Sequence, residues 1–146
     1  MKSWLIAALI VIFSSGPVSA AGSSSSDSPK DPLVNQAKDL IKVEKYAAAI
    51  PVLQQSVAAK ADNADAHNLL GFSFRKLGQY DKAQVSYEKA LSLNADHKGA
   101  LEYLGELYLE TGRPDDARKM LARLDSVCFW GCDEYNDLKK LIEAAQ

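Results

Sequence analysis

The most reactive side chains in this sequence are two closely spaced cysteines. Cys128 and Cys132 enclose the tripeptide Phe-Trp-Gly. Such a pair suits a structural disulfide, a redox-active dithiol or half of a metal site. A thioredoxin-type centre has two intervening residues in a βαβ context. A zinc site needs two more ligands, and His67 and His97 have no ligand spacing of their own. These residues favour a structural disulfide, with redox activity and metal binding as alternatives.

The rest of the chain lacks the residue patterns of common catalytic centres. We find no Ser-His-Asp set, no glycine-rich loop that would cradle a phosphate and no HExxH pair. The 17 basic and 19 acidic residues give a net charge of −2, whereas nucleic-acid binding needs a basic face or stripe. We therefore predict a protein that is not an enzyme, holds no cofactor or metal and does not bind nucleic acid.

The first twenty residues have the three-part pattern of a secretory signal peptide. Lys2 precedes an unbroken apolar run from Trp4 to Phe13, and small residues end the segment at Ala20. Ten apolar residues reach about 15 Å as a helix, half of the ~30 Å hydrocarbon core, so we expect cleavage after Ala20 and no membrane anchor. Residues 21–32 are rich in Ser, Gly and Pro and are predicted to be a flexible linker. The mature protein would be periplasmic or secreted, where a disulfide persists.

The chain repeats itself with a period of 34 residues, which is typical of stacked helical arrays. The positions that coincide are Ala66 and Ala100, Leu70-Gly71 and Leu104-Gly105, Gly78 and Gly112, Asp81 and Asp115, and Ala83 and Ala117. In the first copy Leu70, Phe74 and Leu77 recur at helical spacing on one face. The repeat therefore predicts pairs of helices joined by short turns.

The glycines of the repeat predict where helices meet and where they end. Gly71 and Gly105 lie on the packed face, where a missing side chain lets a second helix come close. Gly78 and Gly112 fall just past the first helix of each unit, where a left-handed backbone favours glycine. Pro114 suits the first position of the helix that follows.

These residues resemble the tetratricopeptide repeat. Residues 64–97 match its pattern closely, residues 98–127 match it with losses, and residues 30–63 are degenerate. The matching residues are Leu70-Gly71, Phe74, Tyr80, Ala83, Tyr87 and Ala90, then Leu104-Gly105, Tyr108 and Ala117, and finally Ala37, Leu40, Tyr46, Ala49 and Leu53. The resemblance implies an all-α, right-handed solenoid of about three repeats within residues 33–127. Pro51 predicts that the second helix of the first repeat starts late or kinks.

Residues 128–146 are expected to close the array with the cysteine-containing turn and a capping helix over 133–145. Asp133 is the expected N-cap, and Tyr135, Leu138, Leu141 and Ile142 form one apolar stripe. Phe129 and Trp130 are expected to pack on the last repeat. The ending also resembles that of short exported repeat proteins of proteobacteria.

The resemblance further implies a concave groove that holds a peptide or a partner helix. The positions that carry over are Asn68, Phe72, Arg75, Lys76, Glu102, Glu106 and Glu110, flanked by Val34, Lys38, Ile41, Lys42, Asp65 and Leu109. The three glutamates follow i, i+4, i+8 spacing and form an acidic stripe, which is alternatively just a solvated helix face. Gly99 and Tyr103 stand where a carboxylate clamp needs cations, so that function is not expected.

The sequence thus predicts an exported protein–protein interaction module or scaffold that binds an unidentified protein or peptide. One alternative is a thiol-active accessory protein that assists the maturation of envelope or cytochrome-type proteins through Cys128 and Cys132. Another is self-association through the groove or the convex face. The sequence does not fix the oligomeric state.

Overall fold

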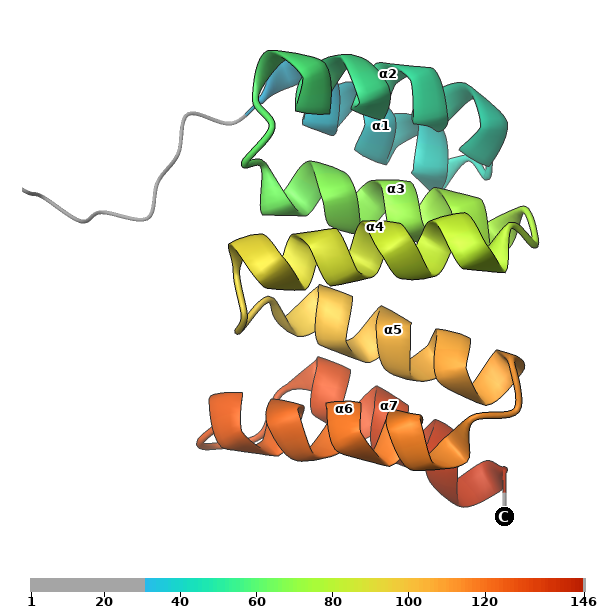
Figure 1. The fold of residues 1–146 in the computed structure, drawn as a ribbon, viewed down its shortest axis with the longest axis vertical. Helices are drawn as coiled ribbons and strands as arrows, with labels where there is room; N and C mark the ends of the chain where they lie inside the picture. The colour runs from blue at the N-terminus through green and yellow to red at the C-terminus, as the bar shows by residue number, and fades with distance from the viewer. Residues whose placement is uncertain (1–30, 146) are drawn as a thin grey trace, which may run out of the picture.

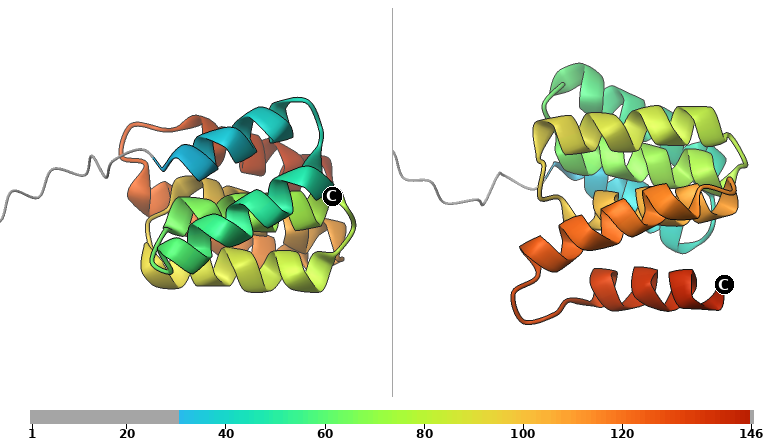
Figure 2. Two further views of the ribbon diagram at one scale, coloured as in Figure 1. Left: turned by 90° about the horizontal axis from the view of Figure 1, so that it is seen from above. Right: turned by 60° about the horizontal axis from the view of Figure 1, so that its bottom comes forward.

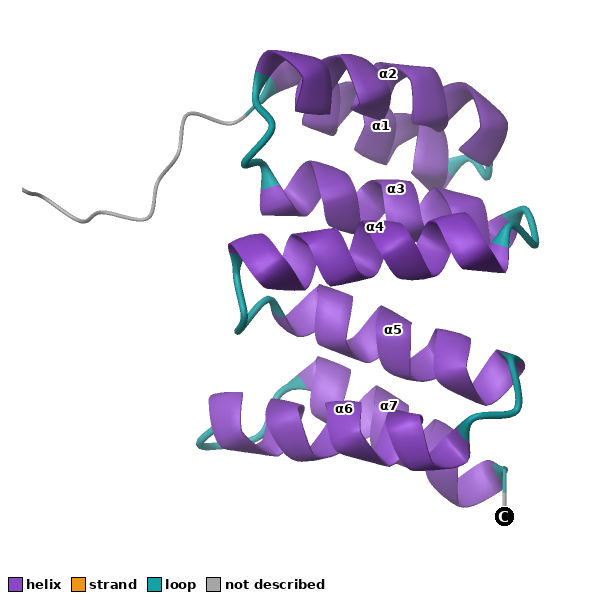
Figure 3. Ribbon diagram, in the orientation of Figure 1, coloured by secondary structure: helices purple, strands orange, loops and turns teal. Residues whose placement is uncertain are grey.

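The computed structural model describes residues 31–145, which form seven helices and no strand (Figures 1 and 3). The predicted signal peptide and nearly all of the predicted linker lie outside these residues. The helices are α1 (Pro32–Lys42), α2 (Tyr46–Ala59), α3 (Ala64–Lys76), α4 (Tyr80–Leu93), α5 (Lys98–Glu110), α6 (Pro114–Val127) and α7 (Asp133–Ala144).

The helices pack as three successive hairpins followed by a single helix. α1 packs on α2, α3 on α4 and α5 on α6, and α7 lies against both α5 and α6. The helix pairs fall within residues 30–63, 64–97 and 98–127. The predicted all-α repeat fold is therefore confirmed.

The turns follow the chemistry that the sequence indicates. Gly78 and Gly112 have φ angles of +71° and +73°, which glycine adopts without steric cost. Asn63 caps α3 through its side-chain oxygen, and His97 caps α5 through Nδ1, each accepting a backbone N–H at 3.1 Å. Pro114 is the first residue of α6. These caps set the start of α3 and α5, the helices that carry most of the predicted groove residues.

Two glycines allow close helix contacts at the centre of the array. A Cβ on Gly71 would lie 2.6 Å from the ring of Tyr87 in α4, and a Cβ on Gly105 would lie 2.5 Å from Leu138 in α7. Tyr87 and Leu138 are fully buried. Both glycines therefore act as predicted, the first within its own hairpin and the second against the terminal helix.

Several local predictions need correction. α2 begins at Tyr46 and contains Pro51, so the predicted late start is wrong. Ala47, whose carbonyl loses its helical partner at Pro51, is exposed to water. α1 begins at Pro32, inside the predicted linker, because the Asp31 carboxylate accepts the Leu33 N–H as an N-cap.

The ends of the later helices also differ in detail. Cys132 is the N-cap of α7 and makes no side-chain capping bond. Asp133 is instead the first helical residue, where a carboxylate favours the positive end of the helix dipole. Leu141 and Leu77 are 42% and 40% exposed and do not belong to the buried stripes. Among residues 31–145, no helix combines the length and apolar character needed to cross a bilayer.

Candidate functional site

The first helices of the hairpins form a continuous layer. α1 contacts α3, α3 contacts α5, and α5 contacts α7. Within residues 31–145, α2 does not contact α4, nor does α4 contact α6. The stack therefore curves, with α1, α3, α5 and α7 on its inner side. Seen from above, α1 and α7 lie on one side of the molecule and α4 on the other (Figure 2). We call the surface of these four helices that faces away from α2, α4 and α6 the inner face.

Arg75 lies at the centre of the inner face and is almost completely buried, with 5% of the residue exposed. Its Nη1 contacts a carboxylate oxygen of Glu106 at 2.5 Å and one of Glu110 at 2.8 Å. The structure therefore brings these three predicted groove residues together. Two of the three glutamates of the acidic stripe are thus paired with Arg75 within the protein.

An aromatic cluster surrounds this ion pair. The ring of Phe72 lies 5.0 Å from that of Tyr103 and 6.0 Å from that of Tyr46, centroid to centroid. The Arg75 guanidinium lies 5.7 Å from the Phe72 and Tyr103 rings, and the Lys76 ammonium 5.3 Å from Phe72. Phe72 is half-buried and packs against neither of the two buried core clusters. It is thus an aromatic side chain of the surface rather than of the core.

The sequence did not indicate two members of this cluster. Tyr46, at the start of α2, is expected from the sequence only as a matching residue of the repeat. Tyr103 is expected only as a residue that stands where a carboxylate clamp would need a cation. Tyr103 lies four residues after Gly99 on α5, which places both on the same side of that helix. This spacing is the one signal in the sequence that could have included Tyr103.

Glu102 is the unpaired member of the acidic stripe. It is 9% exposed, and no cation of residues 31–145 lies within ion-pair distance of its carboxylate. Its pKa is raised to about 7, mainly by burial and further by the nearby charges of Glu106, Glu134 and Asp137, while Arg75 lowers it. Glu134 and Asp137 belong to α7, which the groove prediction did not include.

Other buried polar atoms near Arg75 also have no partner among the described residues. Asn68 is 7% exposed, and its side-chain oxygen accepts no hydrogen bond. The Nε of Arg75 and the hydroxyl of Tyr87 also make no well-aligned hydrogen bond, but these two side chains lie near each other and interact. Since buried polar groups are nearly always hydrogen-bonded, the Asn68 oxygen marks a place where a further group would be accommodated.

The edge of the inner face is fixed by a side-chain hydrogen bond between repeats. Nε2 of His97 lies 2.9 Å from the Asp65 carboxylate. Because Nδ1 of His97 already accepts a backbone hydrogen bond, Nε2 is the donor. This hydrogen bond lowers the pKa of Asp65. Asp65 is therefore occupied in joining α3 to α5.

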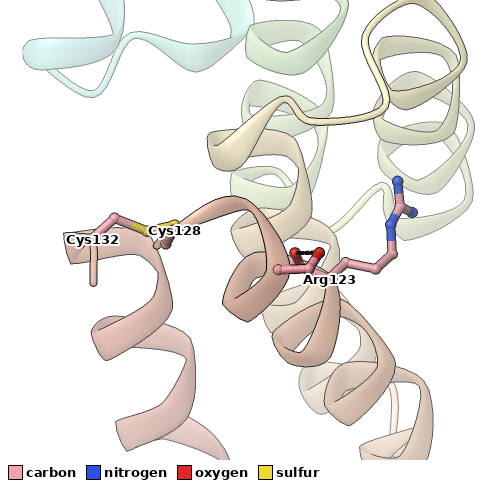
Figure 4. The surroundings of a disulfide bond; sticks show 4 residues. Arg123, Cys128 and Cys132 are labelled. Atoms are coloured by element: carbon pink, nitrogen blue, oxygen red, sulfur yellow. Dashed lines mark hydrogen bonds between the residues drawn. A yellow bond between two sulfur atoms is a disulfide. The ribbon is translucent and has the colours of Figure 1, made fainter. Parts of the chain in front are cut away.

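The two cysteines are joined in a disulfide between the end of α6 and the start of α7 (Figure 4). Their sulfurs are 2.09 Å apart and their Cα atoms 5.7 Å apart. Cys128 is buried, which limits attack on its sulfur by a second thiol. In the part of the chain that the structure describes, no three His, Cys, Asp or Glu side chains are grouped to hold a metal ion.

The loop closed by this disulfide does not pack on the last repeat. Phe129 is 89% exposed and Trp130 is 100% exposed, so the prediction that they cover the repeat is wrong. The turn is short and passes through Gly131, whose φ is +82°. Both aromatic side chains therefore extend from this turn into solvent instead of packing on α5 or α6.

Comparisons with solved structures show the same fold. The Yersinia enterocolitica type III secretion chaperone SycD, in complex with a peptide of the translocator YopD, superposes with a TM-score of 0.67 at 20% identity, over 77% of this chain and 86% of that one. The second tetratricopeptide repeat domain of human RPAP3, in complex with the HSP70 peptide SGPTIEEVD, gives a TM-score of 0.68 at 18% identity, over 76% and 92%.

Sequence comparison points to the same group of proteins. A Drosophila melanogaster protein described as a BBSome complex member BBS4 homolog is 35% identical over 68 residues. The match covers 47% of this chain but only 14% of that protein. Two family models described as tetratricopeptide repeat match residues 34–83 and 74–126. Together they cover residues 34–126, and the chain belongs to the tetratricopeptide repeat family.

Proposed function

We propose that this protein is an exported interaction module that binds a segment of a partner protein on its inner face. The observation that carries the proposal is the position of Phe72. This half-buried ring lies between Tyr46 and Tyr103, outside both core clusters. Aromatic side chains held in place by their neighbours are the usual anchors of protein interfaces.

The surroundings of Phe72 support binding by a preformed surface. Arg75 is held by two carboxylates and stacked near two rings, so few rotamers need to be frozen when a partner binds. The similar SycD and RPAP3 domains are each described in complex with a peptide. At this low identity these domains share only their fold with this chain. The proposal that this chain binds a partner segment rests on the side chains of the inner face.

Site-specific photocrosslinking tests the proposal in cells that make the protein naturally. A photoreactive amino acid replaces the exposed Lys76 on α3, and in a control it replaces Val85 on α4, which is 67% exposed. Position 76 should yield a discrete crosslinked partner and position 85 should not. Identical products from the two positions, or no product from position 76, would contradict binding at the inner face.

Export is a separate part of the proposal. It rests on the apolar run Trp4–Phe13 and the small residues that end at Ala20. The mature chain should begin at Ala21 and appear outside the cytoplasm. Fractionation followed by N-terminal sequencing checks both points, and a cytoplasmic chain that retains residues 1–20 would contradict them.

A further inference from the structure

We propose that Glu102, together with Glu134 and Asp137, forms a subsite of the inner face that receives a lysine or arginine side chain of the partner. This inference rests on the proposed function and specifies the chemistry of the partner segment. It predicts a basic residue next to the part of the segment that contacts Phe72.

The packing of α7 on α5 brings Glu134 and Asp137 near enough to Glu102 for their charges to act on its carboxyl group. Gly105, three residues after Glu102, allows Leu138 of α7 to approach α5 closely. Glu134 lies one helical turn before Leu138, and Asp137 immediately precedes it. Glu134 is half-buried and Asp137 is exposed, so the cluster opens to solvent on one side. A side chain from a partner can therefore reach Glu102 from the inner face.

The protein supplies no cation of its own to this cluster. Arg75, on α3, faces Glu102 but is held by Glu106 and Glu110. Lys98 lies one turn earlier on α5 and makes no ion pair with Glu102 in the described structure. A carboxylate that is nine-tenths buried without a partner is costly, and a cation would remove most of that cost.

The side-chain oxygen of Asn68, close to Glu102, also lacks a hydrogen-bond donor. Asn68 reaches across from α3, with its Nδ2 3.3 Å from the point where a Cβ on Gly99 would lie. Gly99 precedes Glu102 by three residues, which puts Asn68 beside the same side of α5. The Asn68 oxygen is buried and accepts no hydrogen bond. Two unpaired acceptors, one of them acidic, fit a ligand that brings N–H donors and a positive charge.

The ionisation of Glu102 provides an independent signature. Its pKa of about 7 means that much of this carboxyl is protonated in the free protein at neutral pH. A bound cation favours the carboxylate, so binding should release a proton and tighten as the pH rises from 6 to 8. The groups that face Glu102 are Glu106 and Tyr103 on α5, Glu134 and Asp137 on α7, and Arg75 and Asn68 on α3.

A library of random twelve-residue peptides displayed on phage, selected on the purified protein at pH 8, tests the subsite. Enriched peptides should contain a recurrent Lys or Arg. In calorimetry, replacing that residue by Gln should weaken binding roughly tenfold, as expected for a charge-assisted hydrogen bond. Glu102→Gln should cause the same loss, and the two changes together should cost no more than either alone. Glu88→Gln, an exposed charge on α4, is the matched control.

The outcomes separate this inference from the proposed function. If no peptide is enriched, both fail. If peptides are enriched without basic residues, or bind Glu102→Gln as well as the unaltered protein, only the basic subsite fails. Should Glu102→Gln not fold, as judged by circular dichroism, two other measurements decide. These are Asp137→Asn with the same peptides, and proton release by the unaltered protein measured in buffers of different ionisation enthalpy.

Discussion

Replacing Glu102 by Gln should stabilise the free protein at neutral and alkaline pH. Folding moves the pKa of this carboxyl from its ordinary 4.5 to about 7. At ~1.4 kcal/mol per pKa unit, the ionised form costs the folded state about 3 kcal/mol above pH 7. Glutamine removes this cost and keeps nearly the same volume. Since small domains are stable by only about 5–15 kcal/mol, the gain is readily measurable.

The pH dependence follows from the direction of the pKa shift. Below pH 4.5 the carboxyl is protonated in both states, so the variant and the unaltered protein should be about equally stable. Between pH 4.5 and 7 the folded protein holds a proton that the unfolded chain has released. The unaltered protein should therefore lose stability relative to Glu102→Gln as the pH rises through this window. Above pH 7 the difference should be constant.

Urea unfolding followed by circular dichroism at pH 4.5, 6, 7 and 8 measures this difference. The control Glu88→Gln removes an exposed charge on α4 and should change stability by no more than about 0.5 kcal/mol at any of these pH values. A Glu102→Gln variant that is less stable than the unaltered protein at pH 8, or a difference independent of pH, would refute the account of Glu102 as a buried unpaired carboxylate.

Three further substitutions probe the framework that supports the inner face, each by urea unfolding. Arg75→Ala leaves Glu106 and Glu110 unpaired and should cost about 3–5 kcal/mol, less at pH 4 than at pH 8; an equal loss at both pH values would contradict the ion pair. Gly105→Ala places a methyl group 2.5 Å from a buried leucine and should cost about 1–3 kcal/mol; an unchanged midpoint would show that α7 moves freely. Gly112→Ala meets no neighbour but adopts φ +73°, so a loss of about 1–2 kcal/mol is expected, and no loss would argue against the left-handed turn.

Positions governed by local backbone geometry were predictable from the sequence. Gly78 and Gly112 mark the ends of the first helices because a left-handed residue is needed there, and their spacing of 34 residues set the period. Phe129 and Trp130 show the limit of such reasoning. Apolar side chains next to a repeat suggest packing, but the path of a short disulfide-closed turn decides whether they reach it.

The charges of the inner face required the three-dimensional structure. Helical periodicity correctly put Glu102 and Glu106 on one side of α5. It gave no information on which glutamate would meet Arg75, because that depends on how α3 lies against α5. Nor did it indicate that Glu134 would approach Glu102, because the approach depends on the fit between Gly105 and α7. These contacts join residues about 30 positions apart or different helices, beyond the reach of a local pattern.

The same contacts link partner binding to the stability of the array. The two buried core clusters meet at Phe74, which packs against both. Across the inner face, the ion pair of Arg75 with Glu106 joins α3 to α5. The contact between the Phe72 and Tyr103 rings joins the same two helices. A segment bound over these helices would add contacts across the junction, and a ligand that binds only the folded state stabilises it by mass action. A peptide at 100 times its Kd should therefore raise the free energy of unfolding by about 2.7 kcal/mol. Because Glu102 binds fewer protons in such a complex, the gain should be larger at pH 8 than at pH 6, and a peptide without Lys or Arg should not show that difference.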